Sequence, residues 1–454
     1  MDGLEASVEK MRGEGIPEPA VEAFAHYYRR LAEGERGLVP ESDIEPVEDV
    51  PDAEGLPEAD DAGREALDRT VVIKLNGGLG TSMGMTGAKS LIEAKDGLSF
   101  LDVIAHQVLE DRRRFGVRLP LVLMNSFRTR EESLAALEPY PELAVDVPLD
   151  FVQGKVPKLR ADDLLPVSWP DDPTLEWAPP GHGDIYTSLQ TSGMLDALLE
   201  RGYEHAFVSN SDNLGAVVEP RIAAWFAREE LPFAMEVADR TEADRKGGHI
   251  ARRRGGGLIL RETAQTPEED LDAFQDVERH RYFNANTLWI GLRALQQLMR
   301  EREGVLGLPM IVNRKTVDPT DPSSPEVLQL ETAMGAAIGV FEGAAAIRIP
   351  RERLIPVKTT NDLLALRSDA YELGDDYRLR GRAPFIDLDP DHFKLLPDFD
   401  ERFPAGPPSL EHCERLVVKG DVAFGRDVIV RGSVTIEQSG AEQLRIDDGS
   451  VLEG

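Results

Sequence analysis

Segment 71–90, VVIKLNGGLGTSMGMTGAKS, combines the residue types that hold phosphate. A run of β-branched residues, typical of a short buried strand, opens into a loop with four glycines between positions 77 and 84. Lys89 follows nine residues after Gly80. Glycines let backbone N–H groups approach an anion closely, and a lysine adds a compact positive charge. The segment predicts a phosphate-binding loop, although a glycine cluster alone is also typical of an ordinary turn.

Two common phosphate loops do not fit this segment. A P-loop requires glycine directly before the lysine, whereas Ala88 precedes Lys89 here. A dinucleotide-binding loop requires a third glycine, and Met83 occupies that position after Gly78 and Gly80. What remains is the pattern GG-x-GT followed by a distant lysine.

Two further segments offer groups that suit a nucleotide. Gln153, in FVQGKVPK, can donate and accept hydrogen bonds at once, which suits a pyrimidine edge. A solvated basic turn explains that segment equally well. His182 lies in PPGHGD, where prolines and glycines restrict the backbone, so we expect a ligand contact there rather than a structural histidine.

Three more segments offer carboxylate, amide and lysine groups. In SNSDNLG, Asp212 follows an apolar run and is the candidate Mg²⁺ ligand, although an Asx-turn would explain Asn213 as well. In FNANTLW, the amides of Asn284 and Asn286 suit sugar hydroxyls. In PVKTTNDLL, Lys358 could reach a phosphate, although this segment is also an ordinary helix start.

The charge of the chain limits its partners. A formal charge of −32 argues against nucleic acid, so any site for anionic substrates must be locally positive. Lysines are rare, at 11 against 40 arginines. Those in the segments above are Lys74, Lys89, Lys155, Lys158 and Lys358. Where arginine is the usual cation, these lysines indicate a need for compact point charges.

Several features indicate the compartment. The single cysteine, Cys413, excludes an intramolecular disulfide and favours a reducing environment. The charged N-terminus has no apolar core of a secretory signal, and no apolar run approaches 18 residues. We therefore expect a cytoplasmic protein that does not bind membranes.

The elements that must position these groups follow an α/β pattern. From 70 to about 365, short apolar runs alternate with helical patterns, which predicts a mainly parallel sheet with helices on both faces. Ligands of such sheets bind beyond the carboxyl ends of the strands, where the glycine loop is expected. We expect residues 1–69 to form a helical lead-in that continues, at 51–69, into a surface connection. Residues 366–410 are expected to form a second connecting segment.

Residues 411–454 have a different pattern. Apolar residues recur every six positions in two registers, which are Leu416, Val422, Val428 and Val434, and Val418, Phe424, Val430 and Ile436. This repeat predicts the coils of a parallel β-helix. A plain β-meander is the alternative, because the repeat is short.

Together these segments resemble the eukaryotic-type UTP–glucose-1-phosphate uridylyltransferase family over nearly the whole chain. The motifs that carry the resemblance are LNGGLGTSMG, LVLMNSF, PPGHGDIY, SDNLGA, IVNRKT, QLETAMGAAI and PVKTTNDLL. The resemblance implies a Rossmann-like nucleotidyltransferase domain at 70–365, with a mainly parallel mixed sheet, and a C-terminal left-handed parallel β-helix. It implies that UTP and glucose 1-phosphate are converted to UDP-glucose and pyrophosphate with Mg²⁺.

The resemblance also implies roles for single residues. Those implied to bind the nucleotide are Leu75, Gly77, Gly78, Lys89, Gln153, Gly181, Asp212 and Lys358. The resemblance implies that His182 and Asn210 bind the sugar phosphate. Asn284 and Asn286, whose amides suit sugar hydroxyls, are expected to bind the same substrate. Lys89 and Lys358 would be the catalytic cations, and Asp212 would hold the metal.

The chain departs from the family pattern in small ways. Ala88 replaces the usual proline, which we expect to loosen Lys89. Residues 284–287 read Asn-Ala-Asn-Thr where Asn-Thr-Asn-Asn is common, which bears on sugar selectivity. The sequence ends short of the tail through which some animal members assemble, so we expect a monomer or small homo-oligomer.

The chemistry implied needs no nucleophile on the protein. A sugar phosphate oxygen can attack the α-phosphorus of UTP in line, so the protein has only to position two anions and neutralise charge. One alternative is a uridylyltransferase for another sugar 1-phosphate. The other is a non-catalytic UDP-sugar sensor that keeps the fold.

Overall fold

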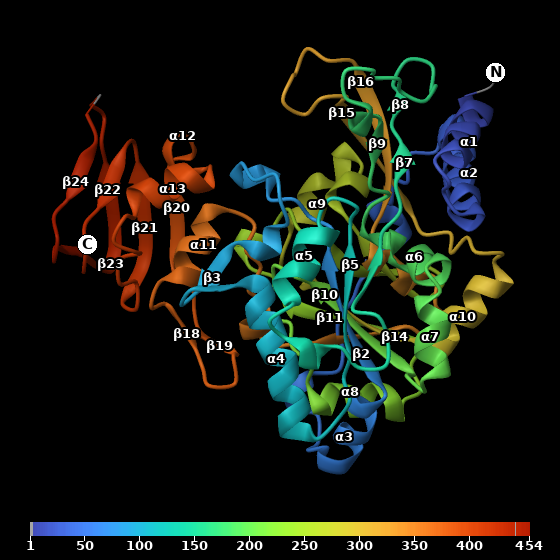
Figure 1. Ribbon diagram of the computed structural model, residues 1–454, viewed down its shortest axis with the longest axis horizontal. Coiled ribbons are helices and arrows are strands. Elements are labelled where there is room, and N and C mark those ends of the chain that lie inside the picture. Colours follow the sequence, from blue (N-terminus) through green and yellow to red (C-terminus); the bar gives the residue numbers. More distant parts are fainter. Residues whose placement is uncertain (1–2, 441) are drawn as a thin grey trace.

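A computed structural model describes residues 3–440 and 442–454, and a sheet covered by helices forms its centre (Figure 1). The strands of this sheet are β1 (Ile44–Pro46), β2 (Thr70–Asn76), β5 (Leu121–Asn125), β6 (Asp150–Val152), β10 (His205–Asn210), β11 (Phe233–Asp239), β12 (His249–Arg253), β13 (Leu258–Arg261), β14 (Tyr282–Gly291) and β17 (Ala345–Arg348). Their main order is β1-β12-β14-β10-β2-β5-β6, with β11 also beside β14, β17 beside β11, and β13 beside β12. The α/β prediction is confirmed.

The β-branched run before the glycine loop is the centre of this sheet. Val71 and Ile73 of β2 pack into the apolar core on one face, and Val72 packs into the core on the other. All three side chains are buried. Successive strand residues point to opposite faces, so a strand covered on both sides reads as a continuous apolar run.

The sheet is mixed, as expected, but it is not mainly parallel. Strands β10, β2, β5 and β6 are parallel to their neighbours in that series, and β11 is parallel to β17. By contrast, β14 runs antiparallel to both β10 and β11, and β12 runs antiparallel to β1 and β13. In the region 240–281, β12 and β13 follow each other without a long crossover helix. Such a helix is needed only where consecutive strands are parallel. The sequence pattern of alternating runs does not distinguish the two cases.

Helices cover both faces of the sheet. They are α3 (Asp60–Asp68), α4 (Phe100–Phe115), α5 (Arg130–Leu137), α6 (Ile185–Thr191), α7 (Met194–Glu200), α8 (Pro220–Arg228), α9 (Leu271–Gln275), α10 (Leu292–Glu301) and α11 (Thr360–Arg367). Residues of α3, α4, α8 and α11 share the core on one face, and residues of α6, α7 and α10 share the core on the other. The helix α3 corrects the expectation of a surface connection at 51–69. Its Gly63 lies directly on Pro220, where an added Cβ would be 2.7 Å from the proline Cβ.

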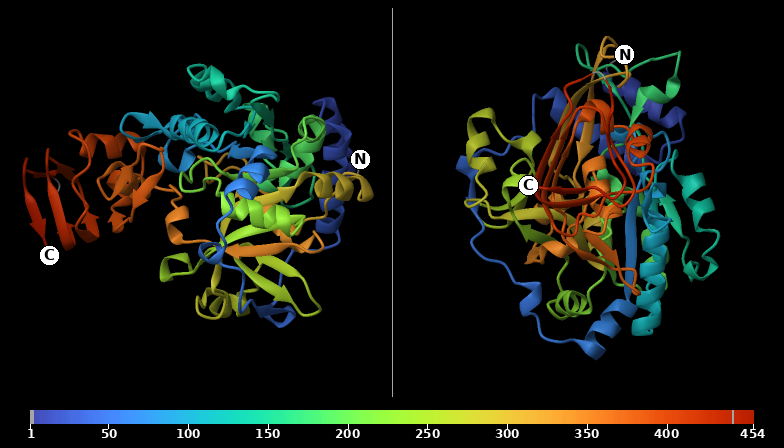
Figure 2. Two further views of the ribbon diagram at one scale, coloured as in Figure 1. Left: turned by 90° about the horizontal axis from the view of Figure 1, so that it is seen from below. Right: turned by 90° about the vertical axis from the view of Figure 1, so that its left-hand side faces the viewer.

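The N-terminal helices α1 (Gly3–Gly13) and α2 (Glu18–Ala32) pack at one end of the molecule (Figures 1 and 2). Their partners are the short strands β7 (Val156–Pro157), β8 (Leu159–Arg160) and β9 (Trp177–Ala178) and the hairpin of β15 (Met310–Thr316) and β16 (Glu326–Thr332). Phe24, Tyr28 and Leu31 recur at helical spacing and are all buried there, so one face of α2 packs onto these strands.

The C-terminal strands stack at the opposite end (Figure 2). Elements of this part are β18 (Tyr371–Leu373), β19 (Leu379–Gly381), β20 (Phe385–Leu388), α12 (Pro390–Phe393), α13 (Leu396–Arg402), β21 (Cys413–Lys419), β22 (Val422–Phe424), β23 (Ile429–Glu437), β24 (Leu444–Ile446) and β25 (Val451–Glu453). A further pair, β3 (Glu93–Lys95) and β4 (Leu98–Ser99), precedes α4.

The six-residue repeat forms parallel coils. Strand β20 pairs with β21, β21 with β23, and β23 with β25, all parallel, and β22 pairs parallel with β24. Leu416 pairs with Val434, three repeats later. This pairing excludes the β-meander for the part of the chain described, since a meander would pair antiparallel. The stack includes Phe385 and so begins before 411, inside the segment expected to connect the two parts.

Over the described ranges, none of the helices combines the length and the apolar composition that crossing a bilayer requires.

Candidate active site

The glycine loop folds back onto the end of β2. Leu79 and Ala88 form an antiparallel bridge, and the Lys89 N–H donates to the Gly78 carbonyl oxygen at 3.1 Å. Gly84 turns the loop with a φ of +77°, a left-handed conformation that favours glycine. The loop thus returns Lys89 to Gly78, as a phosphate-binding loop closed by a lysine requires.

Ala88 compensates for the missing proline. Its backbone N–H donates to Oε1 of Glu132, a bond that a proline at this position could not make. Gly87 lies against the same carboxylate, since an added Cβ would be 2.8 Å from Glu132 Oε2. The expectation that alanine loosens Lys89 is therefore not supported by the local contacts, which anchor the residue before it to α5.

The carboxyl ends of four neighbouring strands gather the candidates for the nucleotide. Leu75 of β2 pairs with Asn210 of β10. On the other side, the N–H of Gln153 donates to the Asn125 carbonyl oxygen at 2.8 Å, which continues the pairing of β5 and β6. The Gln153 side chain lies over Gly77, where an added Cβ would be only 2.7 Å from Oε1. The amide of Gln153 thus borders the glycine loop.

The candidate phosphate lysine and the candidate metal ligand contact each other. Lys89 Nζ lies 2.7 Å from Oδ2 of Asp212, and both side chains are mostly buried. The second carboxylate oxygen, Oδ1, is also buried and has no hydrogen-bond partner among the residues described. A buried acceptor without a donor is rare, because leaving it unpaired costs free energy. This oxygen is available for a cation.

The donor set fits magnesium held jointly with a ligand. Mg²⁺ takes oxygen ligands, keeps several waters, and is often bound by one or two carboxylates together with substrate phosphates. No group of three or more His, Cys, Asp or Glu side chains that could hold a metal occurs within 3–440 and 442–454. A single carboxylate with a free oxygen, beside a phosphate-binding loop, matches that mode of binding.

His182 is held as a neutral donor. Its Nδ1 accepts from the Met334 N–H at 3.0 Å, although the residue is exposed at the surface. A neutral imidazole whose Nδ1 accepts carries its proton on Nε2, so Nε2–H is free to donate to a ligand oxygen. The preceding Gly181 has a φ of +78°, and an added Cβ would be 2.4 Å from the Thr332 carbonyl oxygen. The prolines and glycines of this segment thus serve to place the ring.

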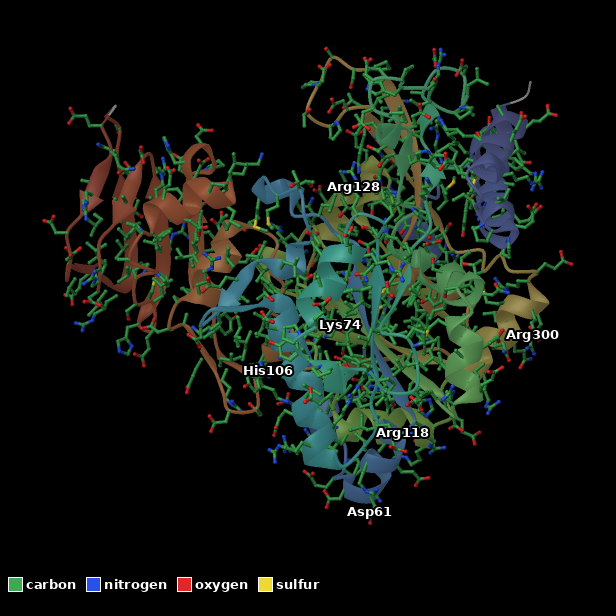
Figure 3. The ribbon with its side chains drawn as sticks, in the orientation of Figure 1. Asp61, Lys74, His106, Arg118, Arg128 and Arg300 are labelled. Atoms are coloured by element: carbon green, nitrogen blue, oxygen red, sulfur yellow. The ribbon has the colours of Figure 1, made fainter. Side chains whose placement is uncertain are left out.

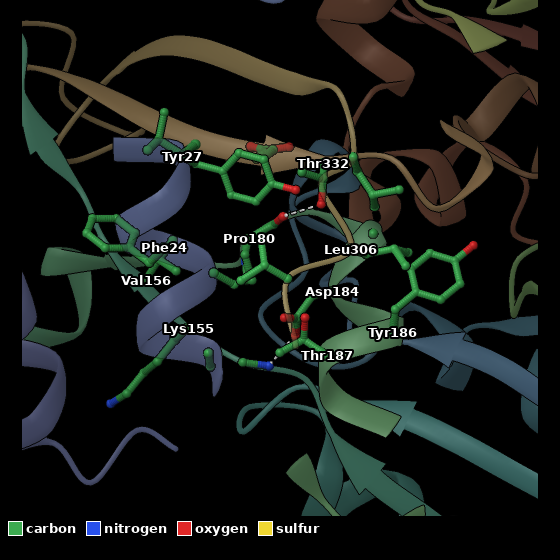
Figure 4. A pocket seen from close by; sticks show the side chains of 18 residues that line it. Phe24, Tyr27, Lys155, Val156, Pro180, Asp184, Tyr186, Thr187, Leu306 and Thr332 are labelled. Atoms are coloured by element: carbon green, nitrogen blue, oxygen red, sulfur yellow. Dashed lines mark hydrogen bonds between the residues drawn. The ribbon is translucent and has the colours of Figure 1, made fainter. Parts of the chain in front are cut away.

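Asp184 links the His182 loop to the Gln153 loop (Figure 4). Its Oδ2 accepts from the Gly154 N–H at 2.6 Å and from Ser188 Oγ at 2.6 Å. Burial raises its pKa to about 6. Two cavities border it: one of about 50 Å³, and one of about 680 Å³ that is also lined by Gln153 and by residues of α6 and α7. The two hydrogen bonds of Asp184 show that it holds the two loops together.

The two candidate amides lie in a bulge of β14. Pairing with β11 shifts register so that Thr287 faces Glu236 while Asn284 faces Val237. Asn286 has a φ of +51°, an uncommon conformation for a residue other than glycine. Its N–H donates to Asn284 Oδ1 at 2.9 Å, and Asn284 Nδ2 donates to Asn286 Oδ1 at 3.0 Å. Bulges often redirect side chains at sites, and this one holds both amides against each other.

Lys358 lies at the start of a capped helix, beside the Asp212 loop. Thr359 and Asp362 form a capping box at the start of α11, and the Lys358 N–H donates to Asp362 Oδ2 at 2.8 Å. The residue before it, Val357, donates its N–H to the Asp212 carbonyl oxygen at 3.1 Å. Helix capping therefore places Lys358 immediately beside the Asp212 loop.

Glu262 is a carboxylate near Lys358 to which no motif in the sequence pointed, and its side chain caps the turn Thr263–Gln265. Burial raises its pKa to about 7, and the charge of Lys358 acts in the opposite direction. Its carboxylate lies on Gly248, where an added Cβ would be 2.5 Å from Oε2. The Gly248 carbonyl oxygen accepts from the Asn284 N–H at 3.0 Å. No motif surrounds Glu262 in the sequence, and only the adjacent glycines 247 and 248 signalled a close approach of backbone.

The candidates therefore form one region along the strand ends. Gly77, Gly78 and Gln153 lie at one side, Lys89 and Asp212 at the centre, and Asn284, Glu262 and Lys358 at the other side. Lys155 points elsewhere, because its Nζ pairs with Glu14 at 2.7 Å and lies over the Trp177 ring. Lys158 donates to the Val317 carbonyl oxygen and is structural.

A glycine loop and a lysine–carboxylate pair at the carboxyl ends of parallel strands, with His182 on a loop that Asp184 joins to the Gln153 loop, are features of an α/β nucleotidyltransferase site. The family model described as UTP–glucose-1-phosphate uridylyltransferase matches residues 21–431. The chain belongs to this family, which confirms the resemblance found in the sequence.

Relatives and solved structures agree with this assignment. The UTP–glucose-1-phosphate uridylyltransferase of Hordeum vulgare is 41% identical over 465 residues, which cover 100% of this chain and 96% of the relative. That of Solanum tuberosum is 42% identical, with 86% and 81% covered. A mutant UDP-glucose pyrophosphorylase from Leishmania major, in complex with UDP-glucose, superposes with a TM-score of 0.94 at 44% identity, with 100% and 98% covered. A structure from Trypanosoma brucei, named UDP-glucose phosphorylase, gives 0.92 at 45% identity, with 99% and 98% covered.

Proposed function

We propose that this protein transfers the uridylyl group of UTP to glucose 1-phosphate and releases UDP-glucose and pyrophosphate. The family assignment supports the reaction. The single observation that carries the placement of the chemistry is the Lys89–Asp212 pair, with its free carboxylate oxygen, beside the glycine loop. A cation site and an anion site are thereby adjacent, as a reaction between two phosphate compounds requires.

In the proposed reaction, a phosphate oxygen of glucose 1-phosphate forms a bond to the α-phosphorus of UTP. The bond from that phosphorus to the bridging oxygen of pyrophosphate breaks, and pyrophosphate leaves with the electron pair. No proton transfer or protein nucleophile is needed, because the attacking oxygen is already anionic. The protein contributes positioning and neutralisation of the charge that accumulates around the phosphorus.

The Lys89–Asp212 pair would open when the substrates bind. Lys89 would turn to the phosphates of UTP, and the freed carboxylate of Asp212 would hold Mg²⁺. When bound, the metal would supply positive charge to the phosphate oxygens. Lys358, next to the Asp212 loop, would contact the reacting phosphates from the other side.

The remaining candidates would orient the two substrates. Leu75, Gly77 and Gly78 would offer backbone groups to the nucleotide, with Gln153 at the uracil edge and Gly181 beside it. His182 would donate its Nε2–H to the sugar phosphate, and Asn210 would contact the same group. Asn284, Asn286 and Glu262 would contact sugar hydroxyls, since they end on the same side as Lys358.

The test is pyrophosphate release from UTP and Mg²⁺ with glucose 1-phosphate, galactose 1-phosphate and N-acetylglucosamine 1-phosphate in parallel. We expect release at least tenfold faster with glucose 1-phosphate. Faster release with another sugar 1-phosphate would favour a uridylyltransferase for that sugar. No release, together with tight binding of UTP, would favour the non-catalytic UDP-sugar sensor.

Three finer expectations belong to this proposal. We propose that the C-terminal coils wind as a left-handed β-helix, since six-residue repeats are typical of that fold. We propose a cytoplasmic location, which the single free cysteine, Cys413, favours. We also propose a monomer or small homo-oligomer as the working state.

A further inference from the structure

Lys74 is a buried lysine without a role in the proposed reaction. It lies in the middle of β2, near the centre of the molecule (Figure 3), and its residue is 2% exposed. Nζ donates to Ser209 Oγ at 2.8 Å and to the Ala216 carbonyl oxygen at 2.8 Å. The Phe207 ring lies 5.8 Å from Nζ. Burying an ammonium group is costly, so the position calls for an explanation beyond packing.

The two acceptors of Lys74 are the two ends of one loop. Ser209 is near the end of β10, and Ala216 follows the SDNLG segment. Between them lie Asn210 and Asp212, two of the proposed site residues. A single side chain in the sheet therefore closes the base of the loop that carries the metal ligand.

The top of the same loop is held by Asn213. Its Oδ1 accepts from the Gly215 N–H at 3.2 Å and from the Ile355 N–H at 2.9 Å. Asn213 also forms an antiparallel bridge with Pro356, two residues before Lys358. The Asx-turn expected from the sequence thus exists, and it joins the Asp212 loop to the segment that ends at Lys358.

Other charges surround Lys74 without bonding to it. The buried Glu236 carboxylate pairs with Arg353 at 2.9 Å, and Asp111 pairs with Arg378 at 2.8 Å. The two carboxylates favour the ammonium form and Arg353 opposes it, while burial lowers the lysine pKa to about 7. Each of these carboxylates already forms an ion pair with an arginine. The specific contribution of Lys74 is therefore its two hydrogen bonds, to Ser209 and to Ala216.

We propose that Lys74 is a positioning residue, which fixes Asp212 by tying Ser209 to Ala216 across the base of the loop. The inference rests on the proposed function of Asp212. A purely structural lysine would affect the stability of the sheet alone. A positioning lysine must also affect the order of residues 209–216 and the affinity for the metal.

The experiment compares Lys74→Met with Ile73→Ala in the full-length chain, at a temperature where both are folded. Ile73 is fully buried on the opposite face of the same strand, where it packs into the other apolar core. We expect Lys74→Met to speed hydrogen exchange of the amides of 209–216 at least tenfold. It should lower kcat at least tenfold and raise the Mg²⁺ concentration for half-maximal activity. Ile73→Ala should lower Tm but leave the exchange of 209–216, kcat and the Mg²⁺ dependence unchanged.

Ser209→Ala removes one of the two bonds with little change in volume and serves if Lys74→Met does not fold. We expect a three- to tenfold faster exchange in the loop. Exchange within twofold of the wild type in every folded variant would overturn the proposal. Hydrogen exchange reports on the loop without turnover, so it distinguishes this failure from the failure of the proposed function, which would appear as a wild-type protein without pyrophosphate release.

Discussion

The C-terminal coils and the candidate active site are built in opposite ways. In the coils, apolar residues recur every six positions, and strands three repeats apart pair in parallel register, so neighbours in the fold follow from a repeat that is visible in the sequence. At the site, Lys89 meets Asp212, and the segment before Lys358 meets the Asp212 loop, through contacts between segments more than a hundred residues apart. Local pattern determines the first region, and sheet topology determines the second. Substitutions should therefore cost stability in the coils and activity at the site.

Removing the phosphate lysine should have the largest effect. We expect Lys89→Ala to lower kcat by roughly 10²–10⁴, the range for preorganised electrostatic groups, with Tm nearly unchanged. Lys358→Ala should behave in the same way. Steady-state kinetics with UTP and glucose 1-phosphate provide the measurement. A loss below fivefold in both variants would refute their roles.

Removing a stacked side chain of the coils should have the reverse effect. Leu416 is fully buried and pairs in register with Val434. Leu416→Ala should lower the free energy of unfolding by about 2–5 kcal/mol, the range for leucine truncation in a core. Chemical denaturation followed by circular dichroism measures this loss. At a temperature where the variant is folded, kcat should stay within twofold of the wild type. A tenfold fall would show that the coils reach the site.

The carboxylate of Asp184 should make stability depend on pH. Because its folded pKa is raised to about 6, its contribution to stability is present below the unfolded value and is lost as pH rises towards 6. Asp184→Asn does not ionise. From pH 4 to pH 6, the unfolding free energy of the variant should therefore increase relative to that of the wild type by roughly 1–3 kcal/mol. Urea unfolding at several pH values provides the comparison, and a constant difference would contradict the raised pKa.

The smallest effect is expected for a lysine of the coils. Lys419 pairs with Glu437 on the surface, and an exposed ion pair adds little to stability because water and salt screen it. Lys419→Ala should leave kcat and Tm almost unchanged, which makes it the charge-matched control for Lys89→Ala. If it lowered kcat as strongly as Lys89→Ala, loss of positive charge in general would explain both results.

The sequence predicted the elements of the site better than its assembly. The glycine loop, the SDN segment and the GHG segment each have a local signature, because their backbone shapes require particular residues. Glu262 and the tie from Lys74 to Ser209 have none, because they depend on which strands are neighbours. The same limit explains the sheet, where antiparallel β14 reads in sequence like any buried strand. Ala88 is a further example, because the sequence suggested a loosened Lys89 and only the structure shows the bond from Ala88 to Glu132.

The central claim is that Lys89 and Asp212 separate to hold the phosphates and the metal. A crystal structure of the protein with UTP and Mn²⁺ in place of Mg²⁺ tests it most directly, since anomalous scattering locates the manganese. We predict that the metal is bonded to Asp212 and to phosphate oxygens, with Lys89 Nζ on the phosphates. A metal bound elsewhere, with the Lys89–Asp212 pair still closed, would contradict the claim.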